Sequence, residues 1–477
     1  MNIPLVVDLD GTLLHTDLLV ESANAHITQN PSQIFGLLGL LQKGRDQLKL
    51  ELARSTSIDV SVLPYNEPLL KWLQTQKANG RTLVLATASA EPLAQQVAQF
   101  LAPLFDEVLA TREGLNLKSH AKAQVLVERF GVGGFDYVGN HDDDLPVWSK
   151  ARQAHVVTND RGLLARVQAM TKVGEIFEAT HTSPWRTWVK ALRIHQWVKN
   201  LLIIVPLLTA HAYGNTDALP AVLLAFGVFS LTASAVYLLN DLIDVQDDRH
   251  HHRKRHRPFA SGQLSLLTGW MAWPLLLGLA FGLSTLLPPV FIAALLAYFL
   301  LTLAYSFLLK EMAIWDVLTL AILYTMRIVA GSAAVGVPLS FWLLLFSMFF
   351  FTSLALIKRF SELFNARQRG QTETLRGRGY QPDDLELVSS LGASAGLMSI
   401  LVLGLYIQDS HTEVLYPAPQ MLWLACPALL AWLMRAWLIA HRGAMHDDPI
   451  VFALKDRTSW LILLFIATAF TLGRIGP

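Results

Sequence analysis

Residues 240–249 read Asn-Asp-Leu-Ile-Asp-Val-Gln-Asp-Asp-Arg and follow an apolar run, Leu219–Leu239, that is long enough to cross a bilayer. Asp241, Asp244 and Asp248 are separated by three and four residues, so on a helix they share one face. Ionisable residues at the end of a membrane helix are energetically expensive and are functional by default. The stretch therefore predicts a membrane helix that ends in a functional carboxylate cluster.

A basic run follows these acids, from His250 to Arg257, and leads into Arg-Pro-x-Ala-x-Gly at residues 257–262. Mg²⁺ is usually held by one or two carboxylates together with substrate phosphates, so acids beside bases suit a magnesium-bound diphosphate. The alternative is a solvated juxtamembrane loop in which the acids and bases only pair with each other. We interpret the triple histidine, His250–His252, as solvated loop and not as a second metal site.

Composition separates the 477 residues into two parts of different character. The chain is 53% hydrophobic and 16% charged, with a mean hydropathy of +0.39, which indicates a membrane protein. Residues 1–180 read as a soluble α/β domain, whereas apolar runs dominate from about residue 195. The net charge of +1 predicts no nucleic-acid partner. The single cysteine, Cys426, excludes a disulfide framework and a thiolate metal site.

Four short apolar runs in the first 180 residues each predict a buried strand. They are Ile3–Val7, Thr82–Ala86, Phe135–Gly139 and His155–Val157, separated by helical patterns such as Ala121–Phe130. Strands that alternate with helices indicate a parallel, doubly wound sheet. Open α/β sheets bind ligands at the carboxyl edge, where three of these runs end in polar residues. The polar ends are Asp8-Leu-Asp10-Gly-Thr12, Thr87-Ala-Ser89 and Asn140-His-Asp-Asp143-Asp144.

The order Asp-x-Asp-Gly-Thr, strand–Thr, lysine and Gly-x-x-x-x-Asp resembles the haloacid dehalogenase (HAD) superfamily of phosphatases. The resemblance implies that Asp8 is the nucleophile that forms an aspartyl-phosphate, that Asp10 is the general acid and base, and that Thr87 binds a phosphoryl oxygen. It also implies a lysine that neutralises charge, for which Lys122 fits best and Lys118 is the alternative. Cations matter here because an anionic nucleophile attacks an anionic phosphate ester.

The same resemblance implies a Mg²⁺ ion held by Asp8, by the main-chain carbonyl of Asp10 and by the last acidic motif. That motif departs from the family pattern, because Asn140 stands where the superfamily usually has aspartate. Asparagine can ligate through its carbonyl oxygen but brings no charge, so Asp143 or Asp144 would have to compensate. Two interpretations stay open: an active phosphatase, or a HAD scaffold without turnover.

This resemblance covers about residues 1–165 and implies a helical cap at about residues 15–80. The segments that would build the cap are Ser32–Leu41, Asp46–Arg54 and Glu67–Lys77, with apolar faces that would cover the phosphate site or lean on the membrane. Residues 181–199 begin as a linker and continue as a basic helix with Trp185 and Trp188, which is typical of an interfacial helix. The alternative there is a packed core helix.

Nine apolar runs predict an all-α membrane domain from residue 200 to 477, each run close to the ~20 residues that a bilayer requires. They lie at about 196–214, 219–240, 267–287, 290–309, 314–336, 340–357, 387–407, 418–440 and 458–474. Lysine and arginine collect in the loops after the even-numbered spans, for example at Arg253, Lys310, Arg376 and Arg442. By the positive-inside rule the N-terminal domain is cytoplasmic and the C-terminus lies outside. We expect a multi-pass protein of the cell (inner) membrane.

That topology places acids for a metal and bases for phosphate on the cytoplasmic side. Asp447-Asp448-Pro449 lies on this side as well as the acidic motif. We assign substrate binding to Lys199, Asn240, Arg257, Tyr305, Lys310, Asp316, Arg327, Lys358, Arg359, Asp456 and Arg457. For Asp316 and Arg327 the alternative is an ion pair inside the helix bundle.

The run Asn-Asp-x-x-Asp-x-x-x-Asp followed by Arg-Pro-x-Ala-x-Gly resembles the UbiA superfamily of intramembrane polyprenyl transferases, over about residues 185–477. The resemblance implies a bundle of nine helices with a Mg²⁺–diphosphate site. In that site Asp241 and Asp244 would be catalytic, and Asp241, Asp244 and Asp248 would hold the metal.

The chain departs from ordinary prenyltransferases, which usually carry a second Asp-x-x-x-Asp cluster where this sequence has Lys358-Arg-x-x-Glu362. Three other patterns resemble the decaprenyl-phosphate phosphoribosyltransferases, which move phosphoribose from phosphoribosyl diphosphate (PRPP) onto a polyprenyl phosphate. These patterns are Gln196-Trp-x-Lys199-Asn200, the spacing of Tyr305-Ser306, Lys310 and Asp316, and the pair Asp456-Arg457.

The resemblances lead to one preferred function and two alternatives. We expect phosphoribosyl transfer from PRPP to a polyprenyl phosphate lipid, with departure of a Mg²⁺-bound diphosphate, and then removal of the 5-phosphate by the HAD-like domain. The second hypothesis is isoprenoid transfer from a prenyl diphosphate to an aromatic or other acceptor, with the HAD-like domain regulatory or inactive. The third is a non-catalytic membrane scaffold or carrier. The polyprenyl length and the oligomeric state stay open.

Overall fold

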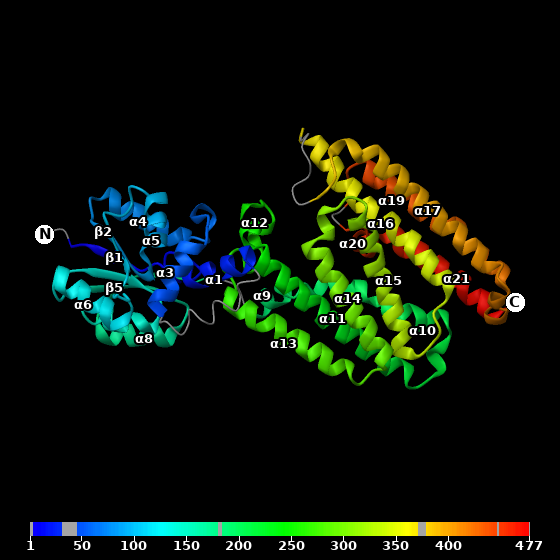
Figure 1. Cartoon of the computed structure of the whole chain (residues 1–477), viewed down its shortest axis with the longest axis horizontal. Coiled ribbons are helices and arrows are strands. Elements are labelled where there is room, and N and C mark those ends of the chain that lie inside the picture. Colours follow the sequence, from blue (N-terminus) through cyan, green and yellow to red (C-terminus); the bar gives the residue numbers. More distant parts are fainter. Residues whose placement is uncertain (1–2, 31–44, 180–183, 371–377, 446–447, 477) are drawn as a thin grey trace. The chain divides into compact units, whose positions relative to one another are not determined.

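The computed structural model describes residues 3–30, 45–179, 184–370, 378–445 and 448–476 (Figure 1). The chain divides into two compact units, which differ from the domains predicted from sequence. The first unit combines Met1–Arg193 with Tyr237–Pro274, and the second combines Ile194–Val236 with Leu275–Pro477. The acidic motif therefore belongs to the same compact unit as the N-terminal domain. The predicted helix Ser32–Leu41, the linker residues 181–183, Arg376 and Asp447 lie outside the described residues.

The N-terminal domain is built on a parallel sheet of six strands in the order β3-β2-β1-β4-β5-β6. The strands are β1 (Leu5–Val7), β2 (Leu83–Ala90), β3 (Glu107–Thr111), β4 (Asp136–Gly139), β5 (Gln153–Val157) and β6 (Lys172–Phe177). The four predicted strands are confirmed, and β3 and β6 are additional. β1 is buried along its whole length because parallel sheets are covered on both faces.

The order of the strands reverses between β1 and β4, which is where open α/β sheets form their ligand-binding crevice. Val7, the last residue of β1, pairs with Leu85 of β2 and Val138 of β4. The polar residues that follow these three positions therefore meet at one edge of the sheet. β2 continues beyond the predicted end to Ala90, with a register shift between Ala86 and Ala90 that redirects its side chains.

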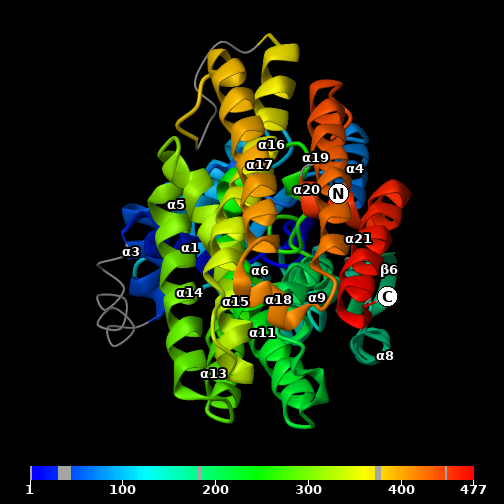
Figure 2. The same ribbon diagram turned by 90° about the vertical axis from the view of Figure 1, so that its right-hand side faces the viewer.

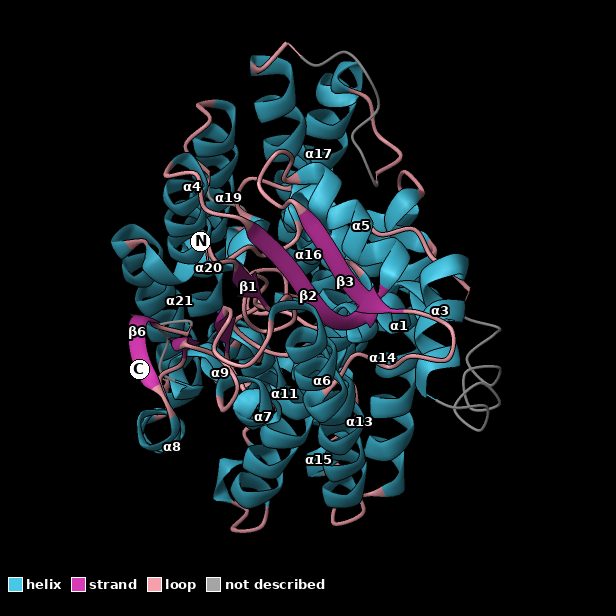
Figure 3. Ribbon diagram, turned by 90° about the vertical axis from the view of Figure 1, so that its left-hand side faces the viewer, coloured by secondary structure: helices cyan, strands magenta, loops and turns pink. Residues whose placement is uncertain are grey.

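Helices cover the sheet and form the cap (Figure 3). In chain order they are α1 (Leu18–Gln29), α3 (Arg45–Ser55), α4 (Glu67–Ala78), α5 (Glu91–Phe100), α6 (Ser119–Phe130), α7 (Leu145–Trp148) and α8 (Arg161–Met170), and α9 (Pro184–Ala191) follows the sheet domain. Apolar residues of α1 and α3, such as Leu18 and Ala53, belong to the same core cluster as Leu85 of β2. The described part of the cap thus packs on the sheet domain, and its expected cover of the phosphate site or contact with the membrane stays a prediction.

The first predicted span, at 196–214, is not one straight α-helix. It comprises a 3₁₀ segment, η4 (Ile194–Ile204), and the short α10 (Val205–Thr209), and this segment is bent by 48° from α9. The backbone of η4 lies close to α15 (Trp315–Val335), since a Cβ on Gly331 would be 2.1 Å from the carbonyl oxygen of Ile203. The described residues contain eight helices long and apolar enough to span a membrane, or nine if the bent pair is one span.

These eight helical segments confirm the other predicted spans to within a few residues at most boundaries. They are Ala218–Ile243 (α11), Leu266–Ser284 (α13), Pro289–Phe307 (α14), Trp315–Val335 (α15), Phe341–Gln368 (α16), Pro382–Ile407 (with α17, Leu385–Ile407), Pro419–His441 (with α19, Ala425–His441) and Arg457–Ile475 (α21). Within the second unit α15 packs on α14 and α16, and α16 packs on α17, as Figure 2 shows. The short helices α12 (Val245–His250) and α20 (Pro449–Lys455) lie between spans.

Candidate active sites

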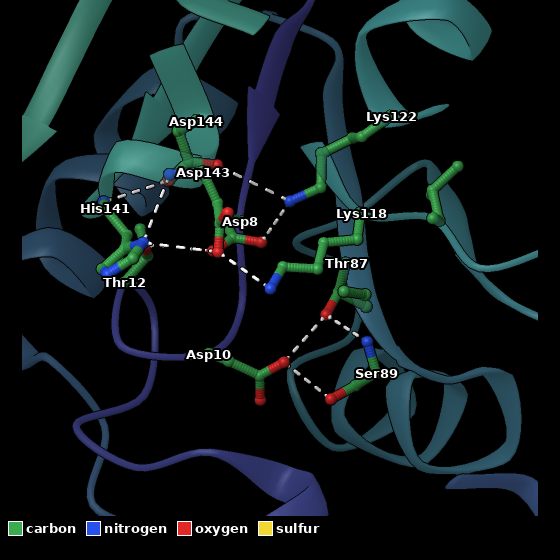
Figure 4. Close-up of polar contacts among 12 residues, drawn as sticks. Asp8, Asp10, Thr12, Thr87, Ser89, Lys118, Lys122, His141, Asp143 and Asp144 are labelled. Carbon is green, nitrogen blue, oxygen red and sulfur yellow. Dashed lines mark hydrogen bonds and ion pairs between the residues drawn. The ribbon is translucent and has the colours of Figure 1, made fainter. Parts of the chain in front are cut away.

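The first site lies at the carboxyl edge of the sheet, around Asp8 (Figure 4). Asp8 directly follows β1 and is 7% exposed. Lys122 Nζ, from α6, donates a hydrogen bond of 2.7 Å to Asp8 Oδ1. Thr12 Oγ1 lies 3.3 Å from Asp8 Oδ2 and 3.1 Å from Asn140 Oδ1. The predicted nucleophile, its lysine and the first residue of the acidic loop therefore converge.

Asp10 is held by the second strand and by the start of α1. Ser89 Oγ and Thr87 Oγ1 lie 2.6 Å and 3.2 Å from Asp10 Oδ2, and the main-chain N–H of Leu18 donates to Oδ1 across 2.9 Å. Thr87 and Ser89 are two residues apart in β2, and both hydroxyls point toward this carboxylate (Figure 4). Ser89 was not predicted, although it is the second residue after Thr87 in the same polar strand end. Lys49 of the cap also reaches this strand end, where its Nζ donates to the carbonyl of Ala88.

The acidic loop after β4 uses its aspartates in different ways. Asp144 accepts hydrogen bonds from the main-chain N–H groups of Asn140 and His141 at Oδ2 and from the hydroxyl of Tyr137 at Oδ1. Asp143 is half-exposed and pairs with Lys118, whose Nζ lies 3.0 Å away. Asp144 thus shapes the loop and Asp143 neutralises Lys118, so their assignment as metal ligands stays a prediction.

Charge makes this pocket suitable for a cation. Burial raises the pKa of Asp8 to about 7, opposed by the adjacent Lys122 ammonium, and Asp144 and Asp10 raise it further. Burial also raises the pKa of Asp10 to about 6. A Mg²⁺ ion, which prefers oxygen ligands, would offset this repulsion and fits the carboxylate of Asp8, the carbonyl of Asp10 and the amide oxygen of Asn140.

The second site surrounds the acidic motif, also within the first unit. Asp241 and Asp248 are 2% and 1% exposed. One guanidinium nitrogen of Arg257 joins them, at 3.1 Å from Asp241 Oδ1 and 2.6 Å from Asp248 Oδ2. Arg193 also forms an ion pair with Asp241. Arg193 had been predicted as part of an interfacial helix, but α9 ends at Ala191 and the side chain turns to the acidic motif.

The predicted common helical face is interrupted at Asp244, where α11 ends and α12 begins. Asp241 and Asp248 still converge on Arg257. Within the described ranges, His, Cys, Asp and Glu side chains form no group of three or more arranged to hold a metal ion. At the acidic motif, Arg193 and Arg257 pair with the carboxylates. In the described part of the chain, Asp248 Oδ1 is buried and accepts no hydrogen bond, and Lys254 Nζ lies 3.8 Å from it. This oxygen fits a magnesium ligand, and burial raises the pKa of Asp248 to about 6.

In the second unit, Lys199 and Asp448 form an ion pair whose side chains are 11% and 13% exposed. Asp448 also caps α20 by accepting from the N–H of Ile450. Burial favours its neutral form, but the charges of Lys199 and Lys358 prevail and lower the pKa of Asp448. Two predicted phosphate-binding lysines therefore lie near one carboxylate. Asp448 was noted in the sequence but not assigned a role.

Asp316 and Arg359 are completely buried in the second unit, with Arg359 Nη2 2.6 Å from Asp316 Oδ2. Tyr380 donates its hydroxyl proton to Asp316 Oδ1 across 2.9 Å, and Arg359 also pairs with Glu362. This arrangement matches the alternative of an intrabundle ion pair for Asp316, with Arg359 as the partner. Substrate binding by Asp316 and Arg359 stays a prediction, and their geometry favours a structural role.

Arg327 is buried at 5% exposure and donates to Asn200 Oδ1, to the carbonyl of Leu323 and to the hydroxyl of Tyr298. Its guanidinium also lies over three aromatic rings. These contacts tie α15 to α14 and η4, so they too favour a structural role over substrate binding.

The remaining predicted residues of the second unit lie near its loops. Arg378 donates to the hydroxyl of Tyr305 and to the carbonyl of Lys310. Asp456 forms a two-point pair with Arg435, at 2.7 Å and 2.9 Å, and caps α21, while its predicted neighbour Arg457 is exposed. Asn240 belongs to the first unit, where it lies on α11 next to Asp241 and is half-buried.

Comparison with known proteins agrees with this geometry. Residues 200–462 match the model of the UbiA prenyltransferase family. The chain belongs to the UbiA prenyltransferase family. Residues 5–148 match the model of haloacid dehalogenase-like hydrolases, so the UbiA domain follows a HAD-like domain in the same chain. The family and the apolar helices together make this UbiA-family protein a multi-pass membrane protein.

Three relatives show how far the similarity extends. Protein y4nM of Sinorhizobium fredii is 37% identical, covering 99% of this chain and 91% of the relative. Nodulation protein NoeC of Azorhizobium caulinodans is 38% identical, covering 60% of this chain and 92% of its own length. Decaprenyl-phosphate phosphoribosyltransferase of Mycobacterium tuberculosis is 34% identical, covering 59% of this chain and 92% of its own length. The UbiA-family protein is thus similar to phosphoribosyltransferases over nearly their whole length.

Proposed function

We propose that this UbiA-family protein transfers phosphoribose from PRPP to a polyprenyl phosphate and that its HAD-like domain then removes the 5-phosphate. The observation that carries the first step is the 34% identity to a decaprenyl-phosphate phosphoribosyltransferase over 92% of that enzyme. The site supports it with two buried carboxylates, Asp241 and Asp248, that meet at one arginine beside a membrane-length helix.

In the transfer step a phosphate oxygen of the lipid attacks the anomeric carbon of PRPP, and the bond from that carbon to the diphosphate breaks. Asp241, Asp244 and Asp248 would hold the diphosphate through Mg²⁺, which supplies the positive charge that the leaving group needs. Arg257 and Arg193, already in contact with these acids, are placed to bind diphosphate oxygens when the carboxylates turn to the metal. Phosphate binding by Lys199, Lys310, Lys358 and Arg457 is part of the same proposal.

In the hydrolytic step Asp8 attacks the phosphorus of the 5-phosphate, and the bond from phosphorus to the ribose oxygen breaks. Asp10 donates its proton to that oxygen and later accepts a proton from the water that hydrolyses the aspartyl-phosphate. The pKa of Asp10, raised to about 6, suits both roles near neutral pH. Lys122 neutralises charge next to Asp8. The products are inorganic phosphate and a ribosyl-phosphoryl lipid.

The acceptor is a lipid, so we place the protein in the inner membrane. We place its N-terminal domain in the cytoplasm, from which the water-soluble PRPP would bind. The basic loops after the even-numbered spans support this orientation.

The second candidate function is transfer of an isoprenoid from a prenyl diphosphate, which the name of the matched family favours. Purified protein in lipid nanodiscs would be given either labelled PRPP with polyprenyl phosphate or labelled geranyl diphosphate with an aromatic acid. Label in a phosphoribosyl lipid supports the proposal. Label only in a prenylated aromatic product would replace it with the second candidate.

A further inference from the structure

Helix α1 of the HAD-like domain and the residues just before it contact residues 240–262 at three places, all within the first compact unit. The central contact is between Glu21 and Arg249. Arg249 Nη2 lies 2.6 Å from Glu21 Oε1, and Nη1 lies 3.0 Å from Oε2, so the pair is bidentate. The two side chains are 0% and 2% exposed. Such a buried two-point pair fixes both distance and orientation.

Arg249 directly follows Asp248, the last acid of the motif. Its Nε donates across 3.0 Å to the carbonyl of Ala260, which lies in the Arg-Pro-x-Ala-x-Gly tail. Arg249 thus ties α12 to the segment that carries Arg257, the residue that joins Asp241 and Asp248. All three donating nitrogens of Arg249 are used, and Glu21 takes two of them.

The second contact fixes the main chain inside the motif. Asn24, one turn after Glu21, is 2% exposed and donates from Nδ2 to the carbonyl of Leu242 across 3.0 Å. Its Oδ1 accepts from the indole N–H of Trp270 across 2.9 Å. Leu242 directly follows Asp241, so this amide holds the chain between the first two acids of the motif.

The third contact is a close approach of two main chains. Gly262 has a φ of +71°, and a Cβ at that position would lie 2.7 Å from both the Cβ and the carbonyl oxygen of His15. Only glycine allows this approach. This close approach packs Gly262, the last residue of the tail, against His15, which precedes α1. At the start of α1, the N–H of Leu18 also donates to Asp10 in the phosphatase site.

We propose that α1 of the HAD-like domain is a positioning element of the transferase, with Glu21 as the residue that orients the acidic motif through Arg249. The helix holds Leu242 and Arg249, and His15 just before it packs against Gly262; together they set the separation at which Asp241, Asp248 and Arg257 receive a diphosphate. This role is independent of phosphatase chemistry. It rests on the proposed function, which assigns diphosphate binding to the motif.

The test compares Glu21→Gln, which keeps the shape and removes the charge, with the wild-type chain in nanodiscs. One readout is backbone amide hydrogen exchange in residues 245–262. The other is steady-state transferase kinetics with PRPP and polyprenyl phosphate. We expect exchange to rise at least about ten-fold, since charge-assisted hydrogen bonds that hold the segment are lost. We also expect KM for PRPP to rise at least about ten-fold, with kcat changed less than about three-fold.

Arg81→Gln is the matched control, because Arg81 forms another buried ion pair of the same domain, with Asp136 at the start of β4. It should leave exchange in residues 245–262 and the KM for PRPP unchanged. Glu21→Asp keeps the charge and provides a milder variant if Glu21→Gln does not fold. It should raise KM by less than Glu21→Gln does.

A double variant, Glu21→Met with Arg249→Met, separates positioning from stability. An apolar pair of similar volume can replace a buried ion pair without loss of stability. We expect it to restore the melting temperature but not the KM, because Ala260 is no longer held. Wild-type KM in this variant, or unchanged exchange in Glu21→Gln, would overturn the inference. If the wild type makes no product from PRPP, the proposed function fails, while the exchange result still decides whether α1 holds the motif.

Discussion

Lys122 Nζ and Asp8 Oδ1 lie 2.7 Å apart in a pocket where both side chains are buried. This pair connects the end of β1 to helix α6 at the point where the order of strands reverses. A carboxylate buried without a cation would be strongly disfavoured, and the Lys122 ammonium opposes the rise in the pKa of Asp8 that burial causes.

Replacement of Asp8 by asparagine should stop the hydrolytic step without stopping the transfer. An amide cannot form the aspartyl-phosphate, so we expect loss of at least about 1000-fold in phosphate release. Lipid products analysed by mass spectrometry should then retain the 5-phosphate. The matched control is Asp142→Asn in the same loop, whose exposed carboxylate pairs with Arg166. Equal phosphate release by Asp8→Asn and Asp142→Asn would contradict the assignment.

The two candidate lysines should differ clearly in their effect on phosphate release. Lys122→Met removes the cation from Asp8, and we expect kcat to fall about 100-fold or more, as for loss of one preorganised electrostatic contact. Lys118→Met removes a half-exposed partner of Asp143 and should lower kcat less than about five-fold. The comparison uses phosphate release from a soluble sugar phosphate by both variants. A larger loss for Lys118→Met would reverse the assignment.

Sequence predicts much of the sheet because its central strands are continuous apolar runs. β1, β4 and β5 were found to within two residues at each end, since burial on both faces leaves little room for polar residues. β6 (Lys172–Phe177) was missed because it is an edge strand with mostly exposed or half-exposed residues. The end of β2 was misjudged because the bulge after Ala86 allows Thr87 and Ser89 to stay in the strand.

Functional residues were predictable where a local motif carries them and not where the contact joins distant segments. Asp8 and Asp10 follow β1, and Thr87 lies toward the end of the adjacent β2, so the three residues converge. Glu21 and Arg249 are 228 residues apart, so no spacing pattern relates them. Arg193 was placed in an amphipathic helix by its neighbours, whereas its own carboxylate partner, Asp241, comes from α11. Apolar runs long enough to cross a membrane predicted the straight spans. Hydropathy does not distinguish a 3₁₀ helix from an α-helix, so the 3₁₀ segment Ile194–Ile204 was not predicted.

Loss of Arg359 should reduce stability more than it affects substrate binding. Arg359→Met would leave the fully buried Asp316 without its cation, at a cost of about 3–5 kcal/mol. The double variant, Asp316→Leu with Arg359→Met, should recover most of the thermal stability, because no unpaired charge stays buried. Thermal unfolding in detergent measures both. If the stable double variant shows a KM for PRPP raised ten-fold or more, these residues bind substrate and the structural interpretation is wrong.

We expect transferase activity to depend on Asp248 of the acidic motif and not on its neighbour Asp247. Asp248→Asn removes a buried carboxylate that contacts Arg257, and we expect transferase activity to fall at least about 100-fold. Asp247→Asn changes an exposed residue in the same turn and should retain activity to within about three-fold. Initial rates of lipid labelling from PRPP measure the difference. Similar rates in the two variants would remove Asp248 from the site.

The most direct test of the two-step account follows a single label. The protein in nanodiscs would be given polyprenyl phosphate, Mg²⁺ and PRPP that carries ³²P only in the 5-phosphate. The account predicts that label enters the lipid first and then leaves it as inorganic phosphate, and that in Asp8→Asn it stays in the lipid. Absence of label from the lipid of Asp8→Asn at every time point would contradict the central claim of phosphoribosyl transfer.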